Sequence, residues 1–186
     1  MKYYKQIFIL SILIFIVSGC SIKGYKYKAD FNSINELKDI NLQSMNIQRN
    51  TLNIDRNEQI TLRAMNMTSP YGGSFSKYLE ISLEEHLKQA LLYDNKSTIK
   101  ISTKLLKNDV NINGFSIGKA DLSAKIIVTI KDKRMYEKVH FITHEWDSSF
   151  IGQIAIENAL INYPIAIQKL INKFMQDKDI IALIKQ

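Results

Sequence analysis

The sequence predicts an α+β fold, a two-layer sandwich in which a mostly antiparallel sheet of about four strands carries two helices on one face. Two segments, 75–91 and 156–174, place apolar residues at helical spacing. Between them, three segments alternate apolar and polar residues with a period of two, which is typical of strands with one buried face. Strands and helices are thus segregated along the chain, as this architecture requires.

The first strand is expected at 58–67, because its apolar residues alternate with others. Turn formers at 68–73 end it. Ser74 or Ser76 can then cap the first long helix by accepting a hydrogen bond from a free backbone N–H. This helix repeats an apolar residue every fourth position, at Phe75, Leu79, Leu83, Leu87 and Leu91.

Three more strands are expected after this helix. Residues 97–106 alternate, and the pattern either continues through Val110 and Ile112 or restarts there. The alternation is clearest at 120–130, and the polar residues 131–134 suit a hairpin turn. The partner strand is then expected at 135–146.

The alternation in this last strand predicts which of its own side chains face the core. We expect Val139 and Phe141 to lie in the core, with Lys138, His140 and His144 on the opposite face. Trp146 is expected to pack at the end of the sheet, with contact to a partner as the alternative.

The second long helix, 156–174, contains Pro164, which removes one backbone hydrogen bond and is expected to kink the helix or restart it. Residues 177–186 are expected to form a short terminal helix or a frayed tail.

The first twenty residues have the composition of an export signal. A positively charged start is followed by an apolar run at 7–17, which is too short to span a bilayer comfortably. Two small residues, Ser18 and Gly19, come next and suit the narrow pocket of a signal peptidase. Cys20 follows directly and is the only cysteine in the chain.

Residues 17–20 resemble the lipobox of bacterial lipoproteins. The resemblance implies cleavage before Cys20, a diacylglycerol thioether on its sulfur and an acyl chain such as palmitate on its new amine. Two or three acyl chains hold a protein stably, whereas one holds it marginally. Ser21, rather than Asp, then favours the periplasmic side of the outer membrane over the inner membrane. An ordinary signal peptide followed by an incidental cysteine is the alternative.

These patterns divide the chain into a signal peptide at 1–19, a lipidated N-terminus and tether at 20–57, and a periplasmic α+β domain at 58–186. The tether has mixed polarity and no sustained period. Five apolar residues within it could instead form a helical turn or dock on the domain: Phe31, Ile34, Leu37, Ile40 and Leu42.

Composition limits the partners and the compartment. A hydrophobic content of 46% is enough for a real core, and the lone cysteine allows no intramolecular disulfide. Loss of Lys2 and Lys5 with the leader takes the formal charge from +7 to +5. This excess suits proximity to anionic lipid headgroups or lipopolysaccharide phosphates, whereas export argues against nucleic acid as a partner.

No catalytic constellation is evident. His140 and His144 share a strand face but lie about 13 Å apart at ~3.3 Å per residue, which is too far for one metal ion. His144 and Glu145 do not belong to a His-Glu-x-x-His motif, and no Gly-x-Ser-x-Gly motif occurs. Gly72 and Gly73 could present N–H groups to an anion, but a tight strand-to-helix turn is the preferred explanation because glycine commonly serves that use. We therefore expect no metal, no cofactor and no enzymatic activity.

One face of the sheet offers a candidate binding site. If both helices cover the other face, a basic surface is left open that could bind a lipid phosphate or an acidic partner. Alternatively, the charged residues of this basic surface only keep an exposed sheet soluble. The predicted surface consists of Lys100, Lys104, Lys125, Lys138 and His140.

The turn at 68–75, followed by a leucine-periodic helix, a hairpin and a C-terminal helix, resembles the LptE-like lipopolysaccharide-assembly lipoproteins and, as a second comparison, the YajG-like lipoproteins. This resemblance implies exposure to the periplasm and a protein partner, with lipopolysaccharide as a further ligand class.

The expected function is a non-enzymatic binding or assembly module of the cell envelope. The alternatives are a carrier of a small lipid or glycan in the groove between helices and sheet, and a hydrolase. A large internal cavity would favour the carrier, whereas a filled core with an exposed patch would favour the module.

Overall fold

The computed structural model describes residues 21–49 and 59–185. Their helices and strands follow one another along the chain as β1 (Ser21–Lys23), α2 (Phe31–Asp39), β2 (Asn46–Ile47), β3 (Ile60–Leu62), β4 (Met65–Thr68), α3 (Phe75–Gln89), β5 (Ile99–Asn111), β6 (Ile117–Ile130), β7 (Lys133–Asp147), α4 (Gly152–Met175) and α5 (Lys178–Ile184).

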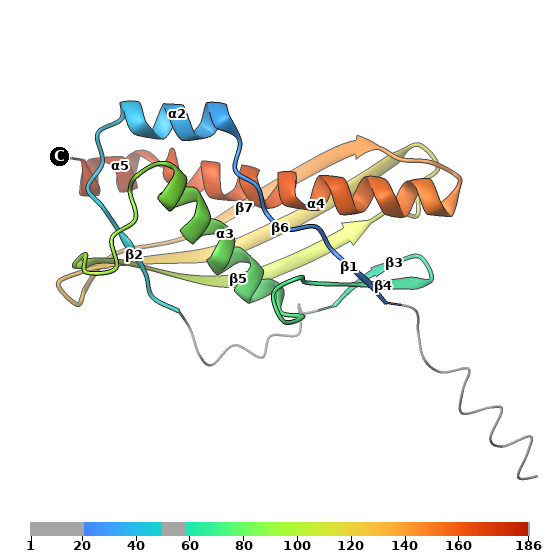
Figure 1. Ribbon diagram of the computed structural model, residues 1–186, viewed down its shortest axis with the longest axis horizontal. Helices are drawn as coiled ribbons and strands as arrows, with labels where there is room; N and C mark the ends of the chain where they lie inside the picture. The colour runs from blue at the N-terminus through green and yellow to red at the C-terminus, as the bar shows by residue number, and fades with distance from the viewer. Residues whose placement is uncertain (1–20, 50–58, 186) are drawn as a thin grey trace, which may run out of the picture.

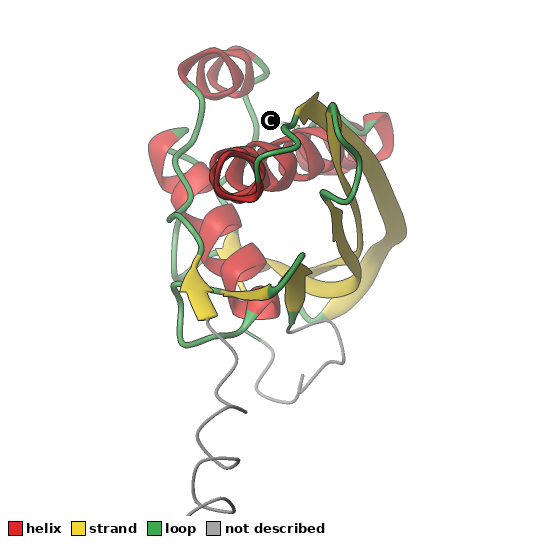
Figure 2. Cartoon of the chain, turned by 90° about the vertical axis from the view of Figure 1, so that its right-hand side faces the viewer, coloured by secondary structure: helices red, strands yellow, loops and turns green. Residues whose placement is uncertain are grey.

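The main sheet has four strands in the order β2-β5-β6-β7. β5, β6 and β7 form an antiparallel meander of 13, 14 and 15 residues, and β2 pairs with β5 in parallel. The sheet curves around α4, and α3 lies on the same side (Figure 2). The predicted α+β class and the two long helices on one face of the main sheet are therefore confirmed, but the expected strand at 58–67 is not in this sheet and β2 takes its place, while α2, α5 and a second sheet were not part of the predicted sandwich. The sheet is mixed rather than purely antiparallel.

A second, smaller sheet has the order β1-β4-β3. The sequence predicted one strand at 58–67, but the chain turns at Arg63, whose φ is 55°, and β3 and β4 form a hairpin. β1 adds to this hairpin in parallel, with Ser21 beside Asn66. Both β1 and the hairpin lie at the same end of the elongated molecule (Figure 1).

The segment expected as a tether is part of the fold. Of the predicted range 20–57, the structure describes 21–49, which supplies β1, α2 and β2. The alternative of a docked segment is therefore correct for these residues, and a domain boundary at 58 is wrong. Their apolar side chains are needed to cover the helices and the sheet edge, as shown by the buried residues Tyr27, Ile34, Leu37, Leu42, Met45 and Ile47.

The turn before α3 depends on two glycines. Gly72 and Gly73 have φ values of 71° and 84°, which side chains with a Cβ rarely adopt. Ser74 then caps α3, because its hydroxyl accepts a hydrogen bond from the Lys77 N–H. Leu91, expected on the apolar stripe of this helix, lies beyond its end and is 79% exposed.

Small residues let α4 lie close to the sheet. Ala120 and Ala124 of β6 and Ala155, Ala159 and Ala166 of α4 are fully buried. A methyl side chain on each partner allows close packing and costs little side-chain entropy on burial. α4 is one continuous helix that runs through Pro164, so the predicted restart does not occur.

An aromatic cluster fills the space between α3, α4 and the sheet. The ring of Tyr163 meets Phe75 at 5.2 Å and Tyr78 at 5.5 Å between centroids, both edge-on. The Tyr163 hydroxyl donates to Asn108 Oδ1 at 2.8 Å, and the Tyr78 hydroxyl donates to the Tyr25 carbonyl at 2.9 Å. Both of these tyrosine hydroxyls thus have a partner, and the region between helices and sheet is packed with side chains.

Trp146 packs at the end of the sheet, as predicted, and is 9% exposed. In the pairing of β6 with β7, Trp146 lies opposite Gly118. A Cβ on Gly118 would lie 2.4 Å from the indole Nε1. The indole therefore needs a residue without a side chain at this position.

We predict that Gly118→Ala lowers the free energy of unfolding by about 1–3 kcal/mol, because the added methyl forces the indole out of its place. Chemical denaturation measures the change. Gly152→Ala is the matched control, since a Cβ there meets only the Arg63 guanidinium at 3.4 Å and alanine favours a helix. Equal stability of the two variants would contradict the close approach at Gly118.

Candidate interaction surface

None of the described helices lies over the face of the main sheet that points away from α3 and α4 (Figure 2). Cross-strand register aligns Lys104, Lys125 and Val139 in one row on this face. The next row contains Lys107 and Phe141, with Ser123 between them. We call this surface, formed by Lys100, Lys104, Lys107, Lys125, Val139 and Phe141, the open sheet face.

Acidic neighbours neutralise part of the positive charge on the open sheet face. Lys100 pairs with Asp132 at 2.7 Å, and Lys125 pairs with Glu137 at 2.7 Å. Lys104 has no ion-pair partner among the described residues, and it lies directly opposite Lys125. Like charges opposite one another on neighbouring strands destabilise a sheet. Of these two lysines, Lys125 is balanced by Glu137, whereas the charge of Lys104 is not balanced by an ion pair among the described residues.

The open sheet face also exposes apolar surface. Val139 is 50% exposed and Phe141 is 45% exposed, although both are hydrophobic. The ammonium of Lys107 lies 5.9 Å from the centre of the Phe141 ring. A surface that combines lysines with half-exposed aliphatic and aromatic side chains can contact a ligand that carries both an acidic group and an apolar group.

The prediction for β7 was wrong in its register. Lys138 and His140 belong to the side of β7 that faces the helices, and Val139 and Phe141 face outward. A strand has a period of two, so an error of one residue moves every side chain to the other face. Lys100, Lys104 and Lys125 do lie on the open sheet face, as predicted, whereas Lys138 and His140 are not part of it.

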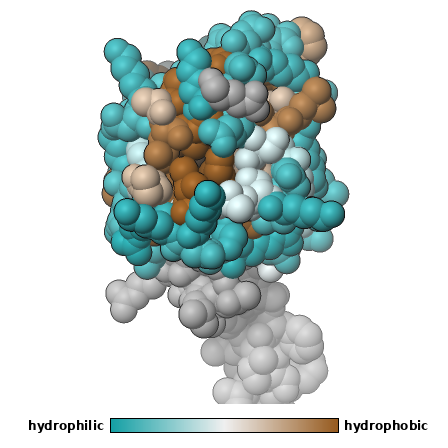
Figure 3. Space-filling view, turned by 90° about the vertical axis from the view of Figure 1, so that its left-hand side faces the viewer, coloured by the Kyte–Doolittle hydropathy of each residue, from teal (hydrophilic) through white to brown (hydrophobic). Residues whose placement is uncertain are grey.

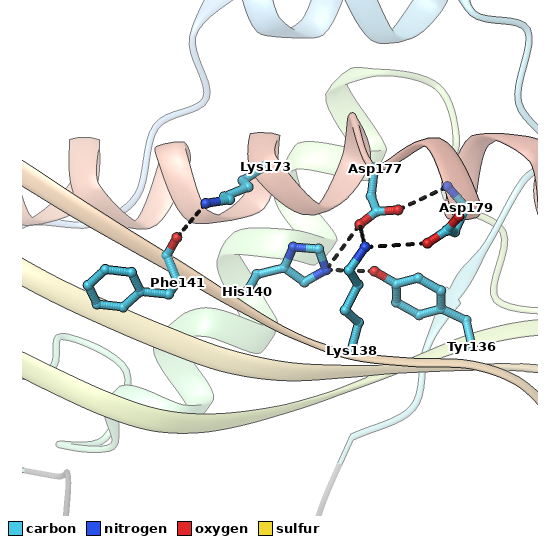
Figure 4. Close-up of polar contacts among 7 residues, drawn as sticks. All are labelled: Tyr136, Lys138, His140, Phe141, Lys173, Asp177 and Asp179. Atoms are coloured by element: carbon cyan, nitrogen blue, oxygen red, sulfur yellow. Dashed lines mark hydrogen bonds and ion pairs between the residues drawn. The ribbon is translucent and has the colours of Figure 1, made fainter.

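His140 belongs to a polar cluster between β7 and the start of α5. Figure 4 shows Tyr136, Lys138 and His140 directed from β7 toward Asp177. The Tyr136 hydroxyl lies 2.6 Å from His140 Nε2, and Lys138 donates to Asp177 at 2.8 Å and to Asp179 at 3.3 Å. Asp177 also caps α5 by accepting from the Asp179 N–H at 2.9 Å. The cluster thus attaches α5 to the edge strand.

His144 is held by α4. Its Nε2 lies 3.0 Å from Asn162 Oδ1, and the Lys169 ammonium lies 2.8 Å from its Nδ1. Since an ammonium can only donate, Nδ1 is the acceptor and Nε2 carries the proton. Both ring nitrogens therefore serve to join β7 to α4.

Burial keeps these histidines neutral. It lowers the pKa of His140 against the opposing effect of Asp177, and it lowers the pKa of His144. Burial tends to raise the pKa of Asp177, but the hydrogen bond from Lys138, the backbone hydrogen bond from Asp179 and the charge of Lys138 together outweigh this and lower it. The side chains best suited to proton transfer are thus enclosed and paired.

An open pocket of about 410 Å³ lies at the end of the β5–β6 hairpin. Lys119 and Asp121 line it and form an ion pair at 3.2 Å, and Asp109 and Asn111 add further polar groups. This pocket is polar and lies away from the groove between helices and sheet.

The sequence did not reveal two apolar areas at the ends of the molecule. At one end, the rings of Phe115 and Phe150 meet at 5.6 Å between centroids, and each is 73% exposed. Each phenylalanine lies in a loop next to a serine, with Ser116 after Phe115 and Ser149 before Phe150, and an aromatic residue in a loop of turn-forming residues was the sign that could have found them.

Figure 3 shows an apolar patch at the opposite end. There α5 meets the segment before β2, because the Gln43 N–H donates to the Ile184 carbonyl at 2.9 Å. The elements of this end carry partly buried apolar residues, namely Ile40, Ile130, Ile181 and Leu183. Only the folded chain brings these positions together.

Cys20 and the signal sequence 1–19 lie outside the described residues. Among the helices that the structure describes, none is long and apolar enough to cross a membrane.

The fold is similar to that of solved structures. A Xanthomonas campestris protein of the DUF330 family matches with a TM-score of 0.56 and 11% identity, over 88% of this chain and 96% of its own. At this identity the match establishes the fold alone.

Two further solved structures are less similar. A candidate lipoprotein from Caulobacter crescentus has a TM-score of 0.45 and 14% identity, over 59% of this chain and 83% of its own. A minor lipoprotein from Acinetobacter baumannii has a TM-score of 0.44 and 10% identity, over 76% and 92%. None of the three is described as an LptE-like or YajG-like protein. The sequence matches no family model and no curated protein.

We predict that acid destabilises the protein through its buried histidines. His86 of α3 is the clearest case, because burial lowers its pKa to about 4. The unfolded chain takes up the proton near pH 6.5, so stability is fully present above that pH and is lost as the pH falls toward 4. The loss from His86 is on the order of 3 kcal/mol.

Chemical denaturation between pH 7 and pH 4 measures this loss. His86→Gln is the test variant, because it keeps a polar side chain near the Tyr27 hydroxyl, which lies 2.7 Å from His86 Nδ1. Its stability should depend less steeply on pH than that of the unmodified protein. Parallel curves for the two proteins would refute the contribution of His86.

Proposed function

We propose that this chain is a lipoprotein of the bacterial cell envelope, anchored through Cys20, whose domain binds an acidic partner with its open sheet face. The anchor rests on the lipobox resemblance at residues 17–20. Ser21 after the cysteine supports the periplasmic side of the outer membrane. The domain acts as an accessory module for binding or assembly and performs no chemical step itself.

The observation that carries the binding role is the pair Lys104 and Lys125 beside half-exposed Val139. Two lysines directly opposite one another cost stability, and a solubilising surface would not require that arrangement. A partner that presents a carboxylate or phosphate beside an apolar group would remove the repulsion and cover Val139. Solubility alone explains lysine on an exposed sheet, but it does not explain the apolar side chains in the same rows.

Two further observations favour a binding module over the alternatives. The aromatic cluster of Phe75, Tyr78 and Tyr163 occupies the region in which a carrier would hold its lipid or glycan. His140 and His144, the side chains that a hydrolase could use for proton transfer, are buried and bonded within the fold.

We predict that Lys104→Glu stabilises the fold and weakens partner binding. The new carboxylate forms an ion pair with Lys125 in place of the repulsion, a gain of about 0.2–1 kcal/mol. The same change puts a negative charge where the acidic partner binds, and recovery of the partner should fall at least about tenfold, the equivalent of 1.4 kcal/mol.

Thermal denaturation measures the first effect, and crosslinking with pull-down of the lipidated protein from membranes measures the second. Lys96→Glu, in the exposed loop before β5, is the control with the same change of charge. Undiminished recovery of the partner with Lys104→Glu would exclude the open sheet face as the binding site. Recovery of lipopolysaccharide instead of a protein would make its phosphates the acidic group.

A further inference from the structure

The fold leaves no spacer between the anchor and the domain. Ser21, the residue directly after Cys20, already pairs with Asn66 in the small sheet. Successive Cα atoms are about 3.8 Å apart, so a lipid on Cys20 would be attached within one residue of the small sheet. A lipid on Cys20 therefore brings this end of the molecule to the level of the headgroups.

Arg63 connects this position to the loops at the same end. It lies in the turn between β3 and β4, close to the pair formed by Ser21 and Asn66. Its guanidinium donates to the Ile112 carbonyl at 3.2 Å, to the Ser149 carbonyl at 2.8 Å and to the Phe150 carbonyl at 2.9 Å. One side chain thus holds the β5–β6 and β7–α4 loops beside the start of β1.

These two loops and the first residues of β6 and α4 expose a group of large apolar side chains, which we call the apolar tip. The loops are joined by a backbone hydrogen bond from the Ser148 N–H to the Ser116 carbonyl at 2.7 Å. The exposed fractions are high for hydrophobic residues, at 73% for Phe115, 56% for Ile117, 73% for Phe150, 56% for Ile151 and 46% for Ile154. Single exposed hydrophobic residues need no explanation, but a contiguous group marks an interaction site.

We propose that the apolar tip inserts into the lipid bilayer that holds the Cys20 anchor. This inference rests on the proposed lipid anchor and adds that the domain lies against the membrane in one fixed orientation. Aromatic and aliphatic side chains on a held loop gain free energy by leaving water for the boundary between headgroups and acyl chains. Lys23, exposed on β1, supplies a positive charge near anionic headgroups.

A lipid surface fits this site better than a protein partner. A protein could approach the apolar tip only by sharing the space with the bilayer to which Cys20 is attached. The bilayer, by contrast, is brought there by the anchor itself, at the distance of one residue from Ser21.

The lone native cysteine makes a direct test practical. Once Cys20 carries lipid, an engineered cysteine is the only free thiol in the chain. Ile151→Cys places an environment-sensitive fluorophore on the apolar tip. Leu91→Cys, with 79% exposure in the native chain, places the same fluorophore beyond the end of α3 as the matched control. The lipidated proteins are reconstituted in vesicles of phosphatidylethanolamine and phosphatidylglycerol, with or without nitroxide-labelled lipid.

We expect a blue-shifted emission and quenching by the nitroxide at position 151, and a water-like, unquenched emission at position 91. Phe115→Ser combined with Phe150→Ser should reduce the quenching at 151 at least about twofold, because these rings supply much of the inserted surface. The control pair Phe31→Ser and Leu91→Ser, whose side chains are 76% and 79% exposed elsewhere, should leave it unchanged.

The outcomes separate the two proposals. Vesicle-bound, lipidated protein with a water-like emission at position 151 would overturn insertion of the apolar tip and leave the anchor intact. Protein whose mass shows no acyl chains, with Cys20 open to maleimide, would overturn the anchor itself and the tip proposal with it. Shielding of position 151 by other envelope proteins, with none in pure lipid, would assign the tip to a protein and overturn the lipid assignment.

Discussion

The burial of one face of the β5–β6–β7 meander under α3 and α4 is the constraint on which the rest of the structure depends. It determines which side chains suit the inward-facing positions of β6. At these positions, alanines at 120 and 124 alternate with larger aliphatic residues. It also determines that α4 packs closely, since its own buried positions are rich in alanine. Within residues 21–49 and 59–185, no helix covers the other side of the sheet.

The same constraint explains the unusual polar content of the inner face of β7. Tyr136, His140 and His144 lie where an ordinary core strand would have aliphatic residues. Buried polar groups are costly unless they are hydrogen-bonded, and here Tyr136 and His140 bond each other near Asp177, while Asn162 and Lys169 of α4 bond His144. The histidines are therefore structural links between the edge strand and the C-terminal helices, which removes them from the open sheet face.

The position of Ser21 relates the fold to the membrane. The strands of the main sheet run along the long axis of the molecule, away from the end that holds β1 (Figure 1). Under the proposed anchoring, the 14 residues of β6 would extend about 45 Å from the bilayer at ~3.3 Å per residue. The open sheet face would then point sideways into the periplasm, and the apolar patch near α5 would be farthest from the lipid.

The sequence by itself determined the α+β class, the positions of the long helices and strands, the cap at Ser74 and three lysines of the candidate surface, because these follow from local periodicity and turn chemistry. It also supplied the lipobox resemblance. Tertiary structure decided the orientation of β7, since a mixed strand with Val139 beside His140 satisfies period two in either register. It decided as well that residues 21–49 pack on the domain and that Phe115 meets Phe150. Those contacts join positions far apart in the chain, and no local pattern encodes them.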